Sequence, residues 1–177
     1  FRSPYTWDKE RVSSYIRYVD TDNQSHWLFD SFLFLEIMDT GTGGANKMFA
    51  KGYNLESANQ ADWTKLIDYY FQSETGIGAL DASVKEASAI LGTPRQKRQI
   101  VISIPEPIVY QHPEQASSST KYWGKIDNQT LDFSNSADRI KACKWYIDQV
   151  RAKFNEKNYQ HVELAGFYWL AEKATDT

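Results

Sequence analysis

The sequence predicts an α/β fold in which parallel strands alternate with helices, as in a (β/α)-barrel, and more specifically the N-terminal half of such a barrel. Four apolar runs have the length of strands, and segments with helical periodicity lie between them. Strands joined through helices pair in parallel, with right-handed crossovers. Since 177 residues is the size of one domain, residues 1–177 are predicted to form a single α/β domain or the N-terminal portion of a longer barrel.

The predicted strands cover residues 15–19, 27–35, 99–104 and 162–169. Runs 27–35 and 99–104 are nearly continuous in apolar character rather than alternating. That pattern is typical of strands buried on both faces, as in a parallel sheet.

Three segments show the spacing of an amphipathic helix, at 61–71, 81–91 and 136–158. The last is the longest, and Ser136 is its predicted N-cap. Its apolar stripe is predicted to consist of Ile140, Cys143, Ile147, Val150 and Phe154.

Composition excludes several classes of protein. The net charge of −3 gives no basic patch, so a nucleic-acid partner is not expected. Since Cys143 is the single cysteine, an intrachain disulfide cannot form. No apolar run approaches the roughly 20 residues of a transmembrane helix. The three histidines, His26, His112 and His161, lack the spacing of metal ligands, so we expect no metal site and no cofactor.

Carboxylates follow the predicted strands, and parallel strands bring their C-terminal ends to one edge of a sheet. Asp20, Glu36, Glu106 and Glu172 each lie at or just beyond such an end. Two carboxylates across a cleft can hydrolyse a glycosidic bond, and their separation decides between retention and inversion. With 23 acidic residues in the chain, chance placement near strand ends is the competing interpretation. The predicted catalytic residues are Glu172, Glu106 and Glu36, with Asp20 as a substrate-binding residue.

Aromatic residues make up 15% of the chain, a surplus that can serve to stack on sugar rings or to build a large aromatic core. Trp169 and Tyr168 precede Glu172 on the last predicted strand, where successive side chains point to opposite faces. One of the two should therefore face the barrel interior, where it would stack on a sugar ring. A role as core filler is the alternative for Trp169.

Two long segments, 39–59 and 105–135, are predicted to be irregular. Each follows the C-terminal end of a strand, where long loops are usually functional or disordered. Within the strand at 27–35, an unpaired charge would be costly, so Asp30 is predicted to pair with Arg17 on the first strand, with a role as a site residue as the alternative.

Three segments resemble a bacterial family of unknown function, the one numbered 4855 in that series. They are WLFDSFLF (27–34), ISIPEP (102–107) and GFYWLAE (166–172). The resemblance covers nearly all of the chain, as the N-terminal part of longer, exported proteins. It implies a barrel-like fold, a role in glycan processing and a secreted, periplasmic or cell-surface location. By analogy of fold it implies an acid/base role for Glu172, after the fourth strand.

The leading hypothesis is therefore that the protein is carbohydrate-active, specifically a glycoside hydrolase, and that it binds a glycan or oligosaccharide. The first alternative is a glycan-binding module that uses its aromatic residues without catalysis. The second is a structural or interaction domain, in which the acids at the strand ends are solvated and separate. The sequence does not specify an oligomeric state.

Overall fold

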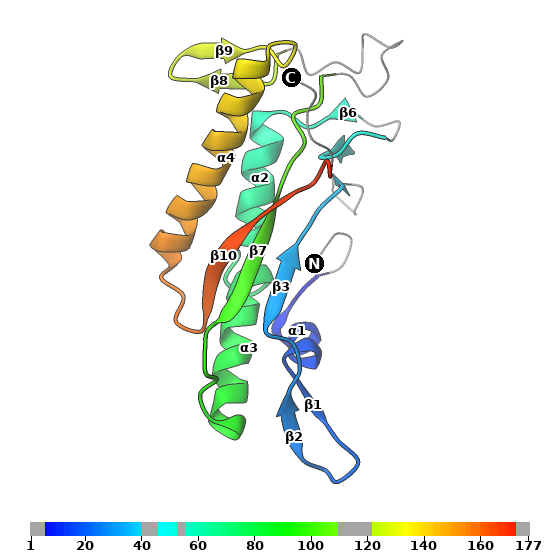
Figure 1. Ribbon diagram of the computed structural model, residues 1–177, viewed down its shortest axis with the longest axis vertical. Helices are drawn as coiled ribbons and strands as arrows, with labels where there is room; N and C mark the ends of the chain where they lie inside the picture. The colour runs from blue at the N-terminus through cyan, green and yellow to red at the C-terminus, as the bar shows by residue number, and fades with distance from the viewer. Residues whose placement is uncertain (1–5, 40–45, 53–55, 110–121, 173–177) are drawn as a thin grey trace.

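The fold is centred on a three-stranded parallel sheet in the order β10-β7-β3 (Figure 1). Its strands are β3 (Ser31–Phe34), β7 (Arg98–Ile104) and β10 (Val162–Trp169). The computed structural model describes residues 6–39, 46–52, 56–109 and 122–172. The sheet confirms the α/β class and parallel pairing for three of the four predicted strands, and the described residues form no closed barrel.

The register of the sheet aligns the three strands at their C-terminal halves. Ile102 of β7 lies beside Phe34 on one side and Phe167 on the other. A bulge between Leu164 and Gly166 shifts the register of β10 by one residue, and the strand then runs on to Trp169 beside Ile104. The strands therefore end close to the same edge of the sheet.

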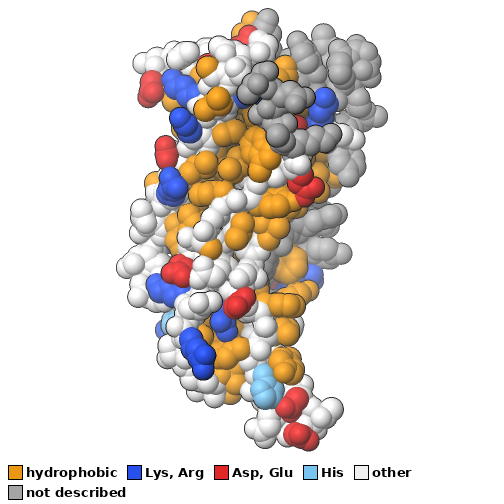
Figure 2. Space-filling model, in the orientation of Figure 1, with side chains coloured by type: hydrophobic (Ala, Val, Ile, Leu, Met, Phe, Trp, Pro, Cys, Tyr) orange, Lys and Arg blue, Asp and Glu red, His pale blue; other side chains and the backbone are white. Residues whose placement is uncertain are grey.

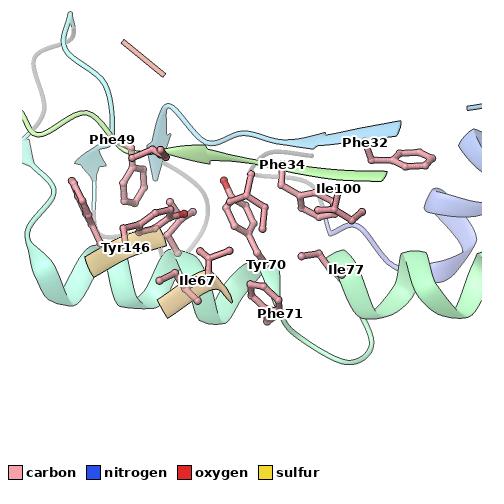
Figure 3. Packing of buried hydrophobic residues seen from close by; sticks show 14 of the residues in the cluster. Phe32, Phe34, Phe49, Ile67, Tyr70, Phe71, Ile77, Ile100 and Tyr146 are labelled. Carbon is pink, nitrogen blue, oxygen red and sulfur yellow. The ribbon is translucent and has the colours of Figure 1, made fainter. Parts of the chain in front are cut away.

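Three helices cover one face of this sheet (Figures 1 and 3). They are α2 (Gln60–Tyr70), α3 (Gly76–Leu91) and α4 (Ser136–Lys157). A capping box begins α2: the side chain of Asn59 accepts hydrogen bonds from the backbone of Ala61 and Asp62, and Asp62 accepts one from the Asn59 amide. These helices confirm the three that the sequence predicts, although α3 begins five residues earlier than expected.

The turn between α2 and α3 depends on a glycine. Gly76 has φ +58°, and a Cβ atom there would lie 2.6 Å from the carbonyl oxygen of Tyr70. Only glycine fits this position without strain, because other residues carry a Cβ and disfavour positive φ.

The predicted first strand, at 15–19, is wrong as a member of the parallel sheet. Helix α1 (Lys9–Ile16) occupies its start, capped by Asp8, whose side chain accepts a hydrogen bond from the Arg11 amide. The chain then forms an antiparallel hairpin of β1 (Arg17–Val19) and β2 (Ser25–Trp27). The run 27–35 is accordingly shared between the end of β2 and the separate strand β3.

The two long segments predicted as irregular contain short strands. In the first, β4 (Met38–Asp39), β5 (Lys47–Met48) and β6 (Glu56–Ser57) form a small mixed sheet. In the second, β8 (Gly124–Ile126) and β9 (Gln129–Leu131) form a hairpin. Residues 40–45, 53–55 and 110–121, with His112, lie outside the described residues.

The hydrophobic core lies between the sheet and the helices, and much of it is aromatic (Figure 3). Trp63 of α2 is fully buried, and its ring packs edge-on against Trp123 at 4.9 Å and against Tyr146 at 5.7 Å. Phe34 of β3 packs edge-on against Tyr70 at 5.6 Å. Much of the aromatic content of the chain therefore lies in the hydrophobic core.

Helix α4 packs on the core with four of the five residues of its predicted stripe: Val150 is buried, and Cys143, Ile147 and Phe154 are partly buried against the core. Ile140 is the exception at 56% exposed, and Asp138, Ala142 and Tyr146 are buried as well. The burial of Asp138 has a local cause, since its carboxylate accepts a hydrogen bond from the Asp132 amide at 2.9 Å. The N-cap is Asn135, which binds the Ala137 amide, and not Ser136.

The opposite face of the parallel sheet carries no described helix (Figure 1). Hydrophobic side chains gather over this face in the space-filling view (Figure 2). Leu33 of β3 is 38% exposed, although its neighbours Phe32 and Phe34 are buried against the helices. The sheet therefore has one packed face and one apolar face that no described helix covers.

Candidate functional site

The candidate site is the C-terminal edge of the parallel sheet, where the sequence places three glutamates. Glu36 follows β3 by two residues, Glu106 follows β7 by two, and Glu172 follows β10 by three. Since the three strands are parallel neighbours, all three residues follow strand ends at the same edge. The structure thus brings the three predicted catalytic positions to one side of the sheet.

Glu106 is fixed at this edge by hydrogen bonds to residues next to β5. Its amide donates to the carbonyl oxygen of Phe49 at 2.8 Å. Its side-chain Oε2 accepts a hydrogen bond from the Lys51 amide at 2.7 Å. The second carboxylate oxygen, Oε1, retains its lone pairs for another contact, so Glu106 combines a fixed orientation with a half-buried carboxylate.

Glu36 is nearly buried, with an exposed fraction of 3%, and lies near two tyrosines at the end of α2. Its negative charge raises the pKa of Tyr69 after the larger effect of burial, with a further contribution from Asp39. It also raises the pKa of Tyr70, for which burial is again the main cause. Both phenols are thereby held neutral, as hydrogen-bond donors, close to a carboxylate.

Glu172 is exposed and adopts a left-handed backbone conformation, with φ 53°. Its amide donates to the carbonyl oxygen of Trp169 at 3.2 Å, which makes a turn directly after β10. Positive φ is uncommon for a residue other than glycine and is often found at functional turns. This turn holds Glu172 beside the end of the strand rather than further along the chain.

The two aromatic residues before Glu172 differ in their surroundings. Trp169 is half-buried and packs against the hydrophobic core, beside Ile104 in the register. Tyr168 is also half-buried, lies beside Ser103 in the register, and is not among the side chains packed on that core. Trp169 therefore serves as part of the core, which was the alternative to a role in sugar binding. Tyr168 is the better placed of the two to contact a ligand.

The prediction that Asp20 shares this edge is wrong. Asp20 follows β1 in the antiparallel hairpin, at the other end of the sheet from the strand ends (Figure 1). Its carboxylate lies 2.6 Å from His26 Nε2, and it accepts the Gln24 amide at 2.8 Å. The hydrogen bond from Gln24, followed by that from His26, lowers the pKa of Asp20. Asp20 therefore holds the hairpin turn together.

The predicted pair of Asp30 and Arg17 is also wrong. Asp30 is exposed just before β3, where its side chain accepts a hydrogen bond from Ser31 Oγ at 3.0 Å. Arg17 instead donates to Ser25 Oγ at 3.2 Å. The cation near Asp30 is Arg98, whose guanidinium carbon lies 4.4 Å from the centroid of the Trp27 ring. Burial lowers the pKa of Arg98, and the charge of Asp30 partly offsets this effect.

Residues that the sequence does not single out also reach the candidate site. Tyr69 and Tyr70 come from α2, and Ser103 from β7. Helical periodicity indicates only that Tyr70 belongs to an apolar face, and it does not show that this face meets the sheet beside Glu36. The run of apolar residues around Ser103 could have drawn attention to a hydroxyl inside a buried strand.

Other chemistries find little support among the described residues. Within ranges 6–39, 46–52, 56–109 and 122–172, no group of three or more His, Cys, Asp or Glu is arranged to hold a metal ion. Burial on α4 raises the pKa of Cys143 to about 12, so its thiol is neutral at physiological pH and a weak nucleophile. No helix in the described part of the chain has the length and apolarity to cross a membrane.

The buried tyrosines predict a loss of stability at alkaline pH. Burial raises the pKa of Tyr70 and Tyr146, whereas the unfolded chain releases these protons near pH 10. Stability should therefore be complete below pH 10 and fall above it, by about 1.4 kcal/mol per pH unit for each phenol. Urea unfolding at pH 9, 10 and 11 measures this, and Tyr146→Phe should make the fall shallower. An unfolding free energy that stays constant to pH 11 would contradict it.

Comparisons with known proteins give one match. No curated protein matches the chain, and no solved structure matches it. One protein family does match, over residues 2–177, and its description is Domain of unknown function (DUF4855). Because this match spans nearly the whole sequence, the chain belongs to the DUF4855 family.

Proposed function

We propose that this protein is carbohydrate-active and hydrolyses glycosidic bonds at the C-terminal edge of its parallel sheet. One observation carries the proposal: three neighbouring parallel strands each lead to a glutamate at the same edge. Hydrolysis of a glycosidic bond needs two carboxyl groups with different tasks, and such an edge is where α/β folds hold their reacting groups.

The surroundings of the glutamates suggest the division of labour. Glu172, exposed on its turn, protonates the oxygen of the leaving sugar. Glu106, oriented by the Lys51 amide, acts on the other side of the bond, either as nucleophile or as the base that takes a proton from water. In both cases one water molecule is consumed, the glycosidic C–O bond breaks, and each product ends with a hydroxyl group. Glu36 is 3% exposed and lies near Tyr69 and Tyr70, so in this proposal it orients the two phenols rather than contacting the sugar.

Sugar binding in this proposal depends on the tyrosines at the edge. Tyr168 lies at the end of β10 outside the core packing, and Tyr69 is only partly buried beside Glu36 and Asp39. Aromatic rings stack on the apolar faces of sugars, while neutral phenols can donate hydrogen bonds to sugar hydroxyls.

The sheet is further proposed to be part of a (β/α)-barrel, with its open face as the barrel interior. The order of the strands in space follows their order in the chain, as in a barrel. Among the described residues, helices cover one face of the sheet, whereas doubly wound sheets carry helices on both faces. The exposed Leu33 on the opposite face fits a surface that further strands would enclose. The proposed location is the periplasm, the cell surface or the exterior of a bacterial cell, where the protein would meet plant and host polysaccharides.

The direct test measures the release of reducing sugar from a panel of plant and host polysaccharides. Wild type should release sugar from at least one member of the panel, and Glu106→Gln should lose most of that activity. Glu163→Gln is the matched control, because Glu163 lies near the start of β10, where it contacts Gln99. If no polysaccharide is cleaved, or if Glu106→Gln and Glu163→Gln are equally active, the hydrolase proposal fails.

A glycan-binding module without catalysis is the second candidate, and the position of Tyr168 outside the core favours it. In that case Tyr168→Ala should abolish binding on a glycan array while Glu172→Gln leaves it intact. Trp169→Ala is a poor test, because Trp169 packs on the core and its loss would destabilise the fold.

A further inference from the structure

The backbone of Glu106 is fixed from both sides. Pro105 and Pro107 flank it, and a following proline favours extended conformations in the residue before it. Neither proline has an amide proton, so Glu106 supplies the backbone donor of this tripeptide, which binds the carbonyl oxygen of Phe49 at 2.8 Å. The carbonyl oxygen of Glu106 accepts a hydrogen bond from the Ile108 amide at 2.9 Å. The main chain at Glu106 therefore has little freedom to move.

Phe49 connects this backbone to the strand end that leads to Glu36. Its carbonyl oxygen accepts the hydrogen bond from Glu106, and its own amide donates to the carbonyl oxygen of Ile37 at 2.8 Å. Ile37 directly follows Glu36 in the chain. The Phe49 side chain is buried in the core, and Figure 3 shows its ring pointing from the edge of the sheet toward the helices. Phe49 thus joins the segments that follow β3 and β7 and is itself anchored by its ring.

The side chain of Glu106 is held by the turn that follows Phe49. The Lys51 amide donates to Glu106 Oε2 at 2.7 Å. The next residue, Gly52, has φ +129°, a conformation that residues with a side chain rarely adopt. No described atom lies within 4 Å of a Cβ atom placed on Gly52. The requirement for glycine therefore comes from the backbone conformation and not from a lack of space.

We propose that Gly52 is a positioning residue for Glu106, because its conformation lets the chain turn directly after Lys51 while the Lys51 amide stays on the carboxylate. The chain must turn here, since β5 and β6 pair in parallel and the short segment 49–55 leads from the end of one to the start of the other. A side chain at position 52 would strain this turn, and relaxation of the strain would move the Lys51 amide away from Oε2. The kinetic consequence rests on the proposed hydrolase function, whereas the hydrogen bond does not.

The kinetic test compares two glycine variants. Gly52→Ala should lower kcat by about 10- to 10²-fold with little change in KM, because a displaced carboxylate impairs the chemical step more than binding. Gly92→Ala is the matched control: Gly92 also has positive φ, +79°, and no described atom within 4 Å of a Cβ atom placed there. Since Gly92 lies between α3 and the start of β7, its substitution should strain the backbone in the same way but leave kcat unchanged. Equal kcat values for the two variants would overturn the proposal.

A double-mutant cycle shows whether the effect of Gly52 passes through Glu106. Glu106→Asp keeps the carboxylate but makes the side chain one methylene too short to reach the Lys51 amide. In that background Gly52→Ala should change the remaining kcat by less than about twofold, because the contact it disturbs is already lost. A general loss of stability would instead lower kcat by the same factor in both backgrounds, and that result would contradict the positioning role.

Hydrogen exchange followed by NMR tests the same contact without any substrate. The Lys51 amide should exchange at least about tenfold faster in Gly52→Ala than in wild type, and at the wild-type rate in Gly92→Ala. The Ala58 amide, which donates to the Met48 carbonyl oxygen at 2.9 Å, reports on the small sheet and should keep its rate in both variants. Unchanged exchange at Lys51, or an increase shared with Ala58, would overturn the proposal. Release of the Lys51 amide in a protein that cleaves no polysaccharide would confirm the contact and reject the hydrolase function alone.

Discussion

Replacing Glu172 with glutamine should lower kcat for hydrolysis of an oligosaccharide by about 10²- to 10⁴-fold, the usual contribution of a general acid. The amide keeps the shape of the side chain but cannot donate a proton to the leaving oxygen. Because Glu172 is exposed on a turn after β10, the change should leave the unfolding free energy almost unaltered. Steady-state kinetics on a substrate from the polysaccharide panel, together with urea unfolding, gives both quantities.

The choice of leaving group separates acid catalysis from a general loss of function. An aryl glycoside with a nitrophenolate leaving group needs little protonation, so Glu172→Gln should keep kcat/KM for it near that of wild type, because kcat/KM reports the step in which the leaving group departs. Glu163→Gln should behave as wild type on both substrates. Equal losses of kcat/KM on the oligosaccharide and the aryl glycoside would show that Glu172 is not the proton donor.

Truncating Trp63 should cause the largest loss of stability, about 3–5 kcal/mol in unfolding free energy for Trp63→Ala. Trp63 is fully buried, and its ring contacts Trp123, Phe133 and Tyr146 within 6.3 Å between centroids. Its removal leaves a cavity where α2 and α4 meet the β8–β9 region, and rigid aromatic neighbours fill such a space poorly. Chemical denaturation monitored by far-UV circular dichroism measures the loss.

Ile140→Ala is the control for this prediction, because Ile140 is 56% exposed on α4. We expect it to change the unfolding free energy by less than about 1 kcal/mol. If Ile140→Ala were as destabilising as Trp63→Ala, the exposed position of Ile140 on α4 would be wrong.

The sequence predicts β7 and β10 closely, since they match runs 99–104 and 162–169. Run 27–35 is nearly continuous in apolar character as well, yet the chain divides it between the end of β2 and the strand β3. The prediction fails at 15–19, where tyrosine, isoleucine and valine suggest a strand, yet Ile16 ends a helix that Asp8 begins. Helix capping and hairpin pairing in this region depend on contacts that a short apolar run does not indicate.

The same limit explains the helix and site residues that sequence reasoning missed. The predicted apolar stripe of α4 is wrong only at Ile140, which is exposed, and apolar spacing does not indicate that Asp138 is buried, where the Asp132 amide compensates its burial. The glutamates at the strand ends could be found from spacing along the chain. Tyr69 and Tyr70 could not, since they approach Glu36 only through the packing of α2 on the sheet.

The measurement that tests the central claim most directly is a map of sugar binding by NMR. Backbone amide shifts of the isotope-labelled chain would be followed during titration with short oligosaccharides from cellulose, xylan and mannan. The account predicts that the largest shifts fall at the C-terminal edge of the parallel sheet, at Glu36, Tyr69, Glu106, Tyr168 and Glu172. Shifts confined to the β1–β2 hairpin around Asp20, or no shifts with any sugar, would contradict it.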